Sequence, residues 1–464
     1  MKLENTSPER IAALAVAQRA YFGSGATLGE AFRREQLRRL GAALKKWEQP
    51  LCEALWQDLH KSKEEAVLTE LSIVEGEIRN HLRHLHRWMR WERRSTPLKM
   101  LPSRSRIVSE PLGCALIVAP WNYPVQLLLN PLVGAISAGC TAMLKPSPYV
   151  PNVSLTIERM IAETFDERYI AVVQGNREVN GRLLEERYDV IFFTGSPSLG
   201  RIVMRAAAEH LTPVVLELGG KSPCIVDRGA DVDLAARRIV WGKTLNAGQT
   251  CIAPDFLMIY RPLQERFIEA FRREVRRMHG DDPRKDRHFV RMVNGRAFDR
   301  VAGYLNDGRV VAGGETNRDE LYIAPTLLAD VDPTSAVMQE EIFGPILPML
   351  CYDRLDEAIT FIRSREKPLA LYLFTSSKAT ERRVFDTLSF GGGCVNDTII
   401  HLATPHMGFG GVGASGMGAY HGKKSFETFT HFRSVVWKST WMDLPMRYHP
   451  YTDKKDKLVR FFLH

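Results

Sequence analysis

The sequence predicts an α/β protein with parallel β-sheets. Its 464 residues suffice for two or three domains of about 100–200 residues each. Hydrophobic residues make up 45% of the chain and charged residues 25%, a balance typical of globular proteins and not of disordered ones. From about residue 105 onward, short apolar runs alternate with helix-like segments, and this alternation indicates βαβ units.

The N-terminal part of the chain, residues 7–94, is predicted to be helical. Ser7-Pro8 has the pattern of an N-cap followed by proline at the first helical position. Thr27-x-x-Glu30 has the spacing of a capping box for the next helix. Residues 64–94 are predicted to form one long helix, which ends before the proline-containing stretch 97–102.

Strands and helices are predicted to alternate through the rest of the chain. The predicted strands span residues 115–119, 142–145, 170–174, 190–193, 213–218, 256–260 and 370–374. The predicted helices span residues 131–138, 153–164, 199–209, 233–246, 264–277 and 380–388. A further strand-like run, Ser434–Trp437, is predicted to pair with Arg106–Ser109.

Charge and cysteine content exclude several classes of protein. The chain carries 63 Lys and Arg against 54 Asp and Glu, and a net charge of +9 is too modest to indicate a nucleic-acid partner. The seven cysteines are scattered singly, so we expect reduced thiols in the cytoplasm, without disulfides or a metal site. The N-terminus lacks the apolar stretch of a secretory signal, and prolines interrupt the one long uncharged stretch, so no membrane anchor is expected.

Cys251 is the strongest candidate nucleophile. It follows the glycine-containing turn Asn246-Ala-Gly-Gln-Thr, and a thiol at the end of such a turn is accessible to activation by local dipoles or a nearby base. The alternative interpretation is a buried structural thiol. The other six cysteines lie in apolar or ordinary surroundings, and we interpret them as structural.

Glu217 is the candidate general base. It lies in the apolar run Val214-Val-Leu-Glu-Leu, where a carboxylate is expected to be either paired or functional. Burial there would raise its pKa toward the range that suits a general base. The alternative interpretation is a strand-end carboxylate that forms an ion pair with Lys221.

Asn122 is the candidate oxyanion donor. It lies between Pro120 and Pro124, directly after the predicted strand 115–119, and open α/β sheets bind ligands at the carboxyl ends of their strands. One amide that donates to a developing oxyanion contributes about 2.7–4 kcal/mol. The alternative interpretation is an asparagine that caps the following turn.

Two further motifs indicate a dinucleotide site. Gly195, Ser196 and Gly200 follow a predicted strand and precede a helix, whose N-terminal amides favour a pyrophosphate. Glu341 can accept hydrogen bonds from ribose hydroxyls, and Phe343 can lie against a flat ring. Each motif has an ordinary alternative, a glycine-containing turn for the first and a solvated acidic turn with a core phenylalanine for the second.

Together these motifs resemble the aldehyde dehydrogenase superfamily. In chain order they are Pro-Trp-Asn, Lys145-Pro-Ser, Phe-Thr-Gly-Ser-x-x-x-Gly, Glu-Leu-Gly-Gly, Gly-Gln-x-Cys and Glu-Ile-Phe-Gly-Pro. The resemblance extends at least over residues 110–429, and the runs at 251–255 and 416–426 resemble the class 3 branch. Some members of that branch carry a hydrophobic C-terminal anchor, and the C-terminal sequence here does not resemble one.

The resemblance implies an aldehyde dehydrogenase-like fold in three parts. These are a Rossmann-type NAD(P)-binding domain (1–97 and 113–212), an α/β catalytic domain (213–405) and a small β oligomerisation segment (98–112 and 406–464). Class 3 relatives are typically homodimers, so the strand at 434–437 is expected to cross to the sheet of a partner.

The resemblance also implies the reaction. An aldehyde, medium-chain aliphatic or aromatic, would be oxidised to the carboxylic acid with NAD or NADP. Cys251 would form a thiohemiacetal and then a thioester, Asn122 and the Cys251 amide would hold the oxyanion, and Glu217 would activate the hydrolytic water.

The remaining implied roles concern binding. Lys145 would bind the adenine-side ribose, Gly195–Gly200 the pyrophosphate, Glu341 the nicotinamide ribose and Phe343 the ring. The substrate pocket would be lined by Tyr123, Trp241 and Phe409. Relatives often read Lys-Pro-Ser-Glu where this chain reads Lys145-Pro-Ser-Pro148, so NADP is expected to be tolerated beside NAD.

Three alternatives stay open at the level of sequence. A CoA-acylating or phosphorylating relative would use the same cysteine but usually lacks the hydrolytic glutamate. A cofactor-free cysteine hydrolase would need a histidine partner, and no histidine lies between His210 and His279. A nucleic-acid module could use the basic, aromatic stretch 81–94, which we interpret as a structural helix.

Overall fold

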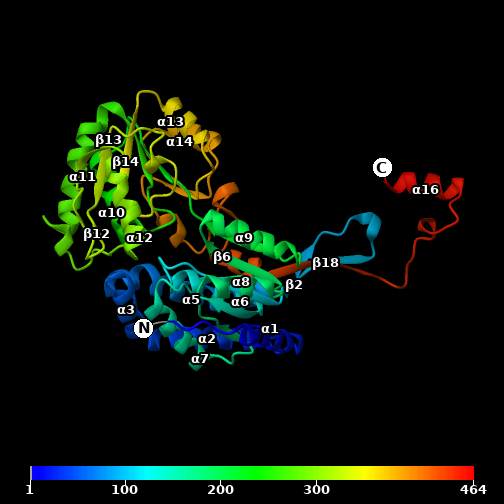
Figure 1. The fold of residues 1–464 in the computed structure, drawn as a ribbon. Coiled ribbons are helices and arrows are strands. Elements are labelled where there is room, and N and C mark those ends of the chain that lie inside the picture. Colours follow the sequence, from blue (N-terminus) through cyan, green and yellow to red (C-terminus); the bar gives the residue numbers. More distant parts are fainter. Residues whose placement is uncertain (1–2, 464) are drawn as a thin grey trace.

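Two mainly parallel β-sheets with their covering helices form the body of the molecule, and a small antiparallel sheet projects from it (Figure 1). The structure is a computed structural model that describes residues 3–463. Met1, Lys2 and His464, which belong to the predicted segments 1–97 and 406–464, lie outside the described residues.

The first sheet has six strands in the order β17-β7-β6-β3-β4-β5. They are β3 (Cys114–Val118), β4 (Thr141–Lys145), β5 (Ile170–Val172), β6 (Val190–Gly195), β7 (Val214–Leu218) and β17 (Gly416–Met417). All are parallel except β17, which pairs antiparallel with β7. The central strands are continuously apolar because helices cover both faces of the sheet, as the fully buried Leu116 and Ile117 show.

Helices from the first half of the chain surround this sheet. They are α1 (Pro8–Gly23), α2 (Glu30–Lys46), α3 (Glu48–Leu59), α4 (Lys63–Ala66), α5 (Ser72–Met89), α6 (Gln126–Ala138), α7 (Pro151–Thr164), α8 (Arg177–Glu185) and α9 (Pro197–Ala208). A π-helix, Val67–Leu71, joins α4 to α5, and the late helix α15 (Lys423–Thr428) packs beside α6. Ser7 caps α1 by accepting a hydrogen bond from the Arg10 amide, as the sequence predicts.

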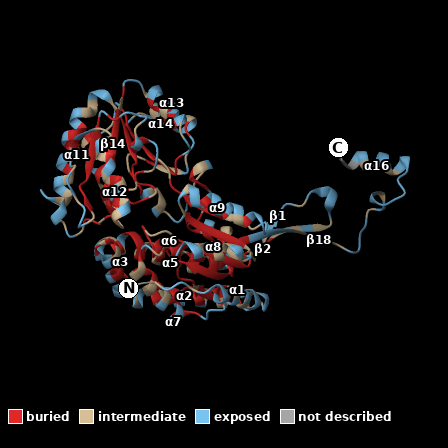
Figure 2. Ribbon diagram, viewed as in Figure 1, coloured by how far each residue is buried: buried red, intermediate tan, exposed pale blue. Residues whose placement is uncertain are grey.

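The second sheet has seven strands in the order β10-β13-β14-β9-β8-β15-β16. They are β8 (Pro223–Val226), β9 (Phe256–Tyr260), β10 (Arg309–Ala312), β13 (Thr326–Ala329), β14 (Ile346–Tyr352), β15 (Ala370–Phe374) and β16 (Gly392–Val395). Its helices are α10 (Val232–Thr244), α11 (Gln264–His279), α12 (Gly295–Gly303), α13 (Leu355–Arg363) and α14 (Lys378–Thr387), and a small hairpin joins β11 (Thr316–Asn317) to β12 (Tyr322–Ile323). The strand interiors are buried and the outer helix faces are exposed (Figure 2).

The third sheet contains β1 (Glu92–Arg94), β2 (Ser103–Pro111) and β18 (Thr430–Lys438). β18 pairs antiparallel with β2, with Val435 opposite Arg106, so the predicted pairing of these segments is confirmed. The sheet extends away from the body, and beyond it α16 (Asp453–Leu463) stands apart from both large sheets (Figure 1). Within residues 3–463, no helix has both the length and the apolar character needed to cross a bilayer.

The remaining helical segments are short 3₁₀ turns. They are Leu98–Met100, Leu245–Gly248, Arg261–Leu263, Pro283–Lys285, Tyr304–Asn306, Ala336–Met338, Ile400–Ala403, Gly413–Ser415 and Pro445–Arg447.

Two sequence-based boundaries differ from the structure. The predicted capping box at Thr27 is wrong, because Thr27 is fully buried beneath the Arg33 side chain and α2 begins after Gly29. The predicted helix 64–94 is interrupted by the π-helix and ends at Met89, because residues 92–94 pair with β2 and tertiary pairing overrides helix propensity. β7, which follows the predicted division at 212/213, lies in the first sheet.

Candidate active site

Two cavities meet at Cys251, between the parts of the chain that carry the two large sheets. We call the first the apolar cavity; it has a volume of about 440 Å³, and its lining includes Tyr123, Leu127, Trp241, Ile252, Leu402 and Phe409. We call the second the polar cavity; it has a volume of about 690 Å³, and its lining includes Asn122, Gly195, Ser196, Glu217, Glu341 and Phe343. Cys251 lines both cavities, so its sulfur lies where their contents can meet.

A strained turn presents Cys251. Asn246, Ala247 and Gly248, which follow α10, all have left-handed backbones, with φ of 52°, 52° and 72°. Non-glycine residues rarely adopt this conformation, and such outliers cluster at functional sites where surrounding contacts over-determine them. Gly248 is required, because a Cβ there would lie 2.2 Å from the carbonyl oxygen of Gly344.

The Cys251 side chain is half-buried and lies near two carboxyl groups. Burial raises its pKa well above the ordinary value, and the nearby Glu341 and Glu217 carboxyls raise it further. The thiol therefore holds its proton at neutral pH in the unliganded protein, and a base must remove that proton before the sulfur can attack a carbonyl.

Glu217 lies near the end of β7 and lines the polar cavity, where it is the candidate base for a water molecule. Its side chain is only 3% exposed, and neither of its carboxylate oxygens has a hydrogen-bond partner. Burial raises its pKa well above the ordinary value. The alternative interpretation, an ion pair with Lys221, is wrong, because the Lys221 ammonium instead pairs with Asp255.

Asn122 follows β3 and is almost fully buried. Its Nδ2 donates to the carbonyl of Gln249 over 2.9 Å, which ties it to the turn before Cys251. An amide nitrogen carries two hydrogens, so one donor is left for a group in the polar cavity. The position therefore suits a donor to the carbonyl oxygen of a substrate whose carbonyl carbon bonds to the Cys251 sulfur.

The N-terminus of α9 opens onto the polar cavity. Gly195 ends β6, and Ser196 caps the helix by accepting a hydrogen bond from the Leu199 amide. Both residues line the cavity, and their position suits an anionic group. Gly200 does not line it; Gly200 packs against Leu218, where a Cβ would approach within 2.8 Å, so its role is close packing of helix against strand.

Glu341 and Phe343 also line the polar cavity. Burial raises the pKa of Glu341 to about 8, and the neighbouring Asp255 also raises it. One Glu341 oxygen has no hydrogen-bond partner, and the carboxylate packs so closely on Gly219 that a Cβ there would lie 2.0 Å from it. The Phe343 ring meets Trp121 edge-on, with 5.3 Å between centroids.

The turn that carries Glu341 is held by residues that sequence reasoning missed. Lys221 donates to the carbonyls of Val337 and Glu340, and Asp255 accepts from the Ile342 amide. The Arg300 guanidinium donates to the Glu341 carbonyl over 3.1 Å. Of these residues, only Lys221 stands in a motif that sequence reasoning singled out. Its position in that motif suggests Glu217 as its partner, whereas the structure pairs it with Asp255.

Lys145 is not brought into either cavity. Its side chain is 1% exposed, and its Nζ donates to the Pro146 carbonyl over 2.8 Å. Burial lowers its pKa to about 8. The three residues predicted to contact the substrate do line the apolar cavity, namely Tyr123, Trp241 and Phe409.

A doubly wound sheet with a helix N-terminus at its carboxyl edge is typical of a nucleotide-dependent enzyme, and Cys251 and the unpaired Glu217 carboxyl, which both line the polar cavity, are its candidate reactive groups. The comparisons with known proteins identify the group more closely. The model of the aldehyde dehydrogenase family matches residues 2–435, and the chain belongs to this family.

Relatives and solved structures agree with this assignment. The chain is 47% identical over 446 residues to 4,4'-diaponeurosporen-aldehyde dehydrogenase of Staphylococcus aureus, an alignment that covers 96% of this chain and 97% of the relative. It is 46% identical over 443 residues to human aldehyde dehydrogenase family 3 member B1, with 95% of each chain covered. A solved structure of the substrate-bound state of Staphylococcus aureus AldH matches with a TM-score of 0.96 and 46% identity, covering 98% of this chain and 99% of that one.

These matches confirm four predictions. The chain has the aldehyde dehydrogenase fold, it is similar to class 3, it is an oxidoreductase, and it oxidises aldehydes with NAD or NADP.

Proposed function

We propose that Cys251, Asn122 and Glu217 carry the oxidation of an aldehyde to its carboxylic acid. The observation that carries the proposal is that Cys251 lies at the junction of an apolar and a polar cavity, and that the polar cavity also contains Asn122 and Glu217. The aldehyde would occupy the apolar cavity and the dinucleotide the polar cavity.

Several features of the polar cavity fit NAD(P). The free end of α9 suits the pyrophosphate, and the unpartnered Glu341 oxygen suits a ribose hydroxyl. Gly219 leaves the backbone bare beside Glu341, where a ligand must approach closely. When bound, NAD(P)⁺ accepts the hydride of the aldehyde carbon.

The chain's own residues perform the other steps. The Cys251 thiol gives its proton to solvent, the sulfur bonds to the carbonyl carbon, and the oxygen becomes an oxyanion that accepts hydrogen bonds from Asn122 Nδ2 and the Cys251 amide. Loss of hydride from that carbon restores the carbonyl as a thioester. Glu217, once its proton has passed to solvent, takes a proton from water, and the resulting hydroxide displaces the Cys251 thiolate to release the acid.

An apolar aldehyde, medium-chain aliphatic or aromatic, is the proposed substrate. Support comes from the lining of the apolar cavity, where aromatic side chains such as Trp241 and Phe409 face a space of about 440 Å³. The location of Glu217 in the polar cavity favours hydrolysis of the thioester over its transfer to CoA.

We further propose that residues 1–97 and 113–218 form the NAD(P)-binding domain and residues 219–405 the catalytic domain. The order of the strands supports this division, which includes β7 in the first domain. We also propose a homodimer that forms through the segments 98–112 and 406–464, and a cytoplasmic location. The exposed edge of β18 supports the dimer, and seven free cysteines support a reducing compartment.

An absorbance assay at the reduced-nicotinamide band tests the proposal. Aliphatic and aromatic aldehydes are offered with NAD or NADP, with and without CoA, to the wild type and to Cys251→Ala. We expect reduction by the wild type without CoA, release of the free acid, and no reduction by the variant. Reduction by Cys251→Ala, or a requirement for CoA, would contradict the assignment.

A further inference from the structure

Lys61 forms an ion pair that is completely removed from solvent. It follows the left-handed residue His60 at the end of α3, and its Nζ lies 2.6 Å from Oε1 of Glu70. Both side chains are 0% exposed. Burying such a pair costs about as much free energy as its attraction returns, so the pair is weak evidence for a stabilising role and calls for another explanation.

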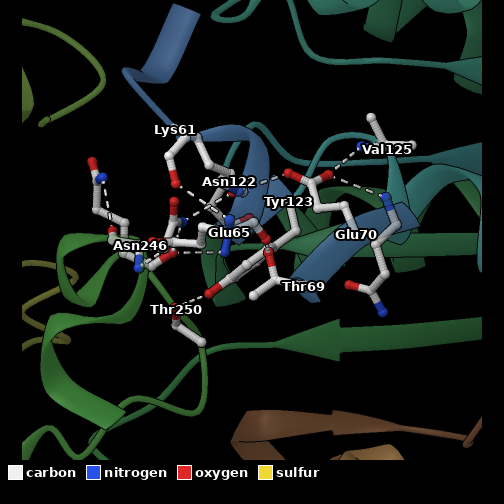
Figure 3. Close-up of polar contacts among 12 residues, drawn as sticks. Lys61, Glu65, Thr69, Glu70, Asn122, Tyr123, Val125, Asn246 and Thr250 are labelled. Atoms are coloured by element: carbon white, nitrogen blue, oxygen red, sulfur yellow. Dashed lines mark hydrogen bonds and ion pairs between the residues drawn. The ribbon is translucent and has the colours of Figure 1, made fainter. Parts of the chain in front are cut away.

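Both partners extend from this pair to the segment that carries Asn122 (Figure 3). Lys61 Nζ donates to the Asn122 carbonyl over 3.1 Å and lies 4.3 Å from the centroid of the Tyr123 ring. The second oxygen of Glu70 accepts from the amides of Val125 and Gln126 at the start of α6. The pair thus binds the segment 122–126 at two places, at the carbonyl of its first residue and at the amides of its last two.

The same contacts continue to the turn before Cys251. The Asn122 carbonyl also accepts from Asn246 Nδ2 over 3.0 Å, and the Asn246 amide donates to Glu65 Oε1 over 2.8 Å. Asn122 Nδ2 and Asn246 Nδ2 both donate to the Gln249 carbonyl over 2.9 Å. The Tyr123 hydroxyl lies 2.6 Å from the hydroxyl of Thr250.

Asn122 is therefore fixed at its backbone by Lys61 and at its side chain by the strained turn. A buried cation is the stronger of the two donors to the Asn122 carbonyl, because a charged donor forms a bond about twice as strong as a neutral one. Without it, the Asn122 carbonyl would keep only Asn246 as a donor, and the backbone that carries the Asn122 side chain would be held less firmly.

We propose that Lys61, paired with Glu70, is a positioning residue that aims the Asn122 amide at the oxygen of the carbon bonded to Cys251. This inference rests on the proposed function, since it assigns the oxyanion to Asn122. Lys61 contacts neither cavity among the described residues, so it acts through Asn122 and not on the substrate. A displacement of about 1 Å at such a donor can cost about a hundredfold in rate.

The test is a double-variant cycle on the hydride step. Lys61→Met/Glu70→Gln removes both charges together, because Lys61→Met alone would leave Glu70 buried and unpaired and could prevent folding. The amide oxygen that Glu70→Gln introduces can still accept from the Val125 amide. The rate constant of the NAD(P)H burst is measured in the presence and absence of Asn122→Ala, because this constant is independent of the fraction of enzyme that is folded.

We expect the double variant to slow the burst at least about tenfold. In the Asn122→Ala background we expect no further loss, and NAD(P)H binding measured by fluorescence should stay within about twofold in every variant. Arg33→Met is the matched control: it removes a buried cation that donates to the Thr27 and Ser137 carbonyls, away from both cavities. It should lower the melting temperature and leave the burst rate constant unchanged.

Two results would overturn the role of Lys61. One is a wild-type burst rate constant in Lys61→Met/Glu70→Gln, and the other is losses that multiply when Asn122→Ala is added. The proposed function is tested separately by Asn122→Ala alone. If that variant has the wild-type rate constant, Asn122 itself has been misassigned, and with it the basis for a role of Lys61.

Discussion

At the scale of single residues, burial without a hydrogen-bond partner distinguishes Glu217. Glu217 has no partner for either oxygen and Cys251 lies near two carboxyls, so both groups hold their protons in the resting site. Elsewhere a buried carboxylate is paired, as Glu70 is with Lys61. An unpaired buried carboxyl costs stability, and it is expected only where the chemistry needs a proton acceptor.

Substitution of Glu217 separates the two halves of the reaction. Glu217→Gln should retain an NAD(P)H burst but lower steady-state turnover by about 10²–10⁴-fold, because water loses its base. Rapid mixing followed by steady-state recording measures both. Loss of the burst as well would mean that Glu217 is also needed to deprotonate Cys251 at the pH used.

The direction of the pKa shifts gives a pH dependence. Since burial raises the pKa of both Cys251 and Glu217, the deprotonated forms that react become more abundant as the pH rises above 7. Wild-type turnover should therefore increase with pH over this range, measured as kcat at saturating aldehyde and cofactor. A kcat that falls between pH 7 and 9, with the enzyme still folded, would contradict the assignment.

Cofactor selectivity is expected to depend on residue 148. Pro148 follows β4 where relatives often carry glutamate, and proline neither repels a 2′-phosphate nor binds ribose hydroxyls. NADP should therefore be used with a kcat/KM within about a thousandfold of that with NAD, or about 4 kcal/mol. Pro148→Glu should lower kcat/KM for NADP more than for NAD. Equal effects on the two cofactors would argue against a role for this position.

At the scale of elements, the ends of strands and the turns after them build the site. Asn122 follows β3, Gly195 ends β6 and Glu217 lies in β7, so three neighbouring strands bring three candidate site residues to one edge of a sheet. The second sheet adds the Cys251 turn and the turn that carries Glu341. Close approach between these turns, and not the motifs alone, sets the shape of the polar cavity.

Gly219 tests this close approach. A Cβ in Gly219→Ala would lie 2.0 Å from Glu341, so the carboxylate must move, and the KM for NAD(P) should rise about tenfold, equivalent to about 1.4 kcal/mol. The adjacent Gly220→Ala is the matched control, because the nearest atom there is 3.5 Å away. Its effect on KM should be much smaller. Equal effects of the two substitutions would contradict a steric role for Gly219.

The sequence predicts some of these elements and site residues and not others, for physical reasons. Apolar runs identify buried parallel strands such as 115–119, and motif residues identify Cys251 and Glu217, because their types and spacing are constrained locally. Lys61 and Glu70 could not be predicted, because they meet only after a π-helix and the loop beyond β3 have folded together. The strand 92–94 could not be predicted for the same reason, since only its pairing with β2 makes it a strand.

At the scale of the whole molecule, the outer edge of β18 has no partner strand among the described residues. Within this part of the chain β18 is therefore an edge strand, and it exposes Phe432, Val436 and Trp437. Figure 2 shows β18 as half-buried or exposed, whereas the strands of the two large sheets are mostly buried. Exposed apolar edges invite pairing with another chain. A second copy that pairs along this edge would account for the exposure.

Truncation tests the proposed dimer. A chain that ends before residue 430 loses β18 and should be monomeric or aggregated in light scattering, whereas a chain that ends at Lys438 keeps the strand, loses α16 and should remain dimeric. An intact, active dimer from the shorter chain would contradict a role for β18. Loss of the dimer from the longer chain would assign the contact to residues 439–464 instead.

The central claim is that the Cys251 sulfur bonds covalently to the aldehyde carbon while the dinucleotide is reduced. Mass spectrometry of Glu217→Gln, mixed with aldehyde and NAD and quenched after one turnover, tests it most directly. The account predicts an acyl group on the peptide that contains residue 251, in amounts equal to the NADH formed, and neither product from Cys251→Ala. NADH formed without that adduct would contradict it.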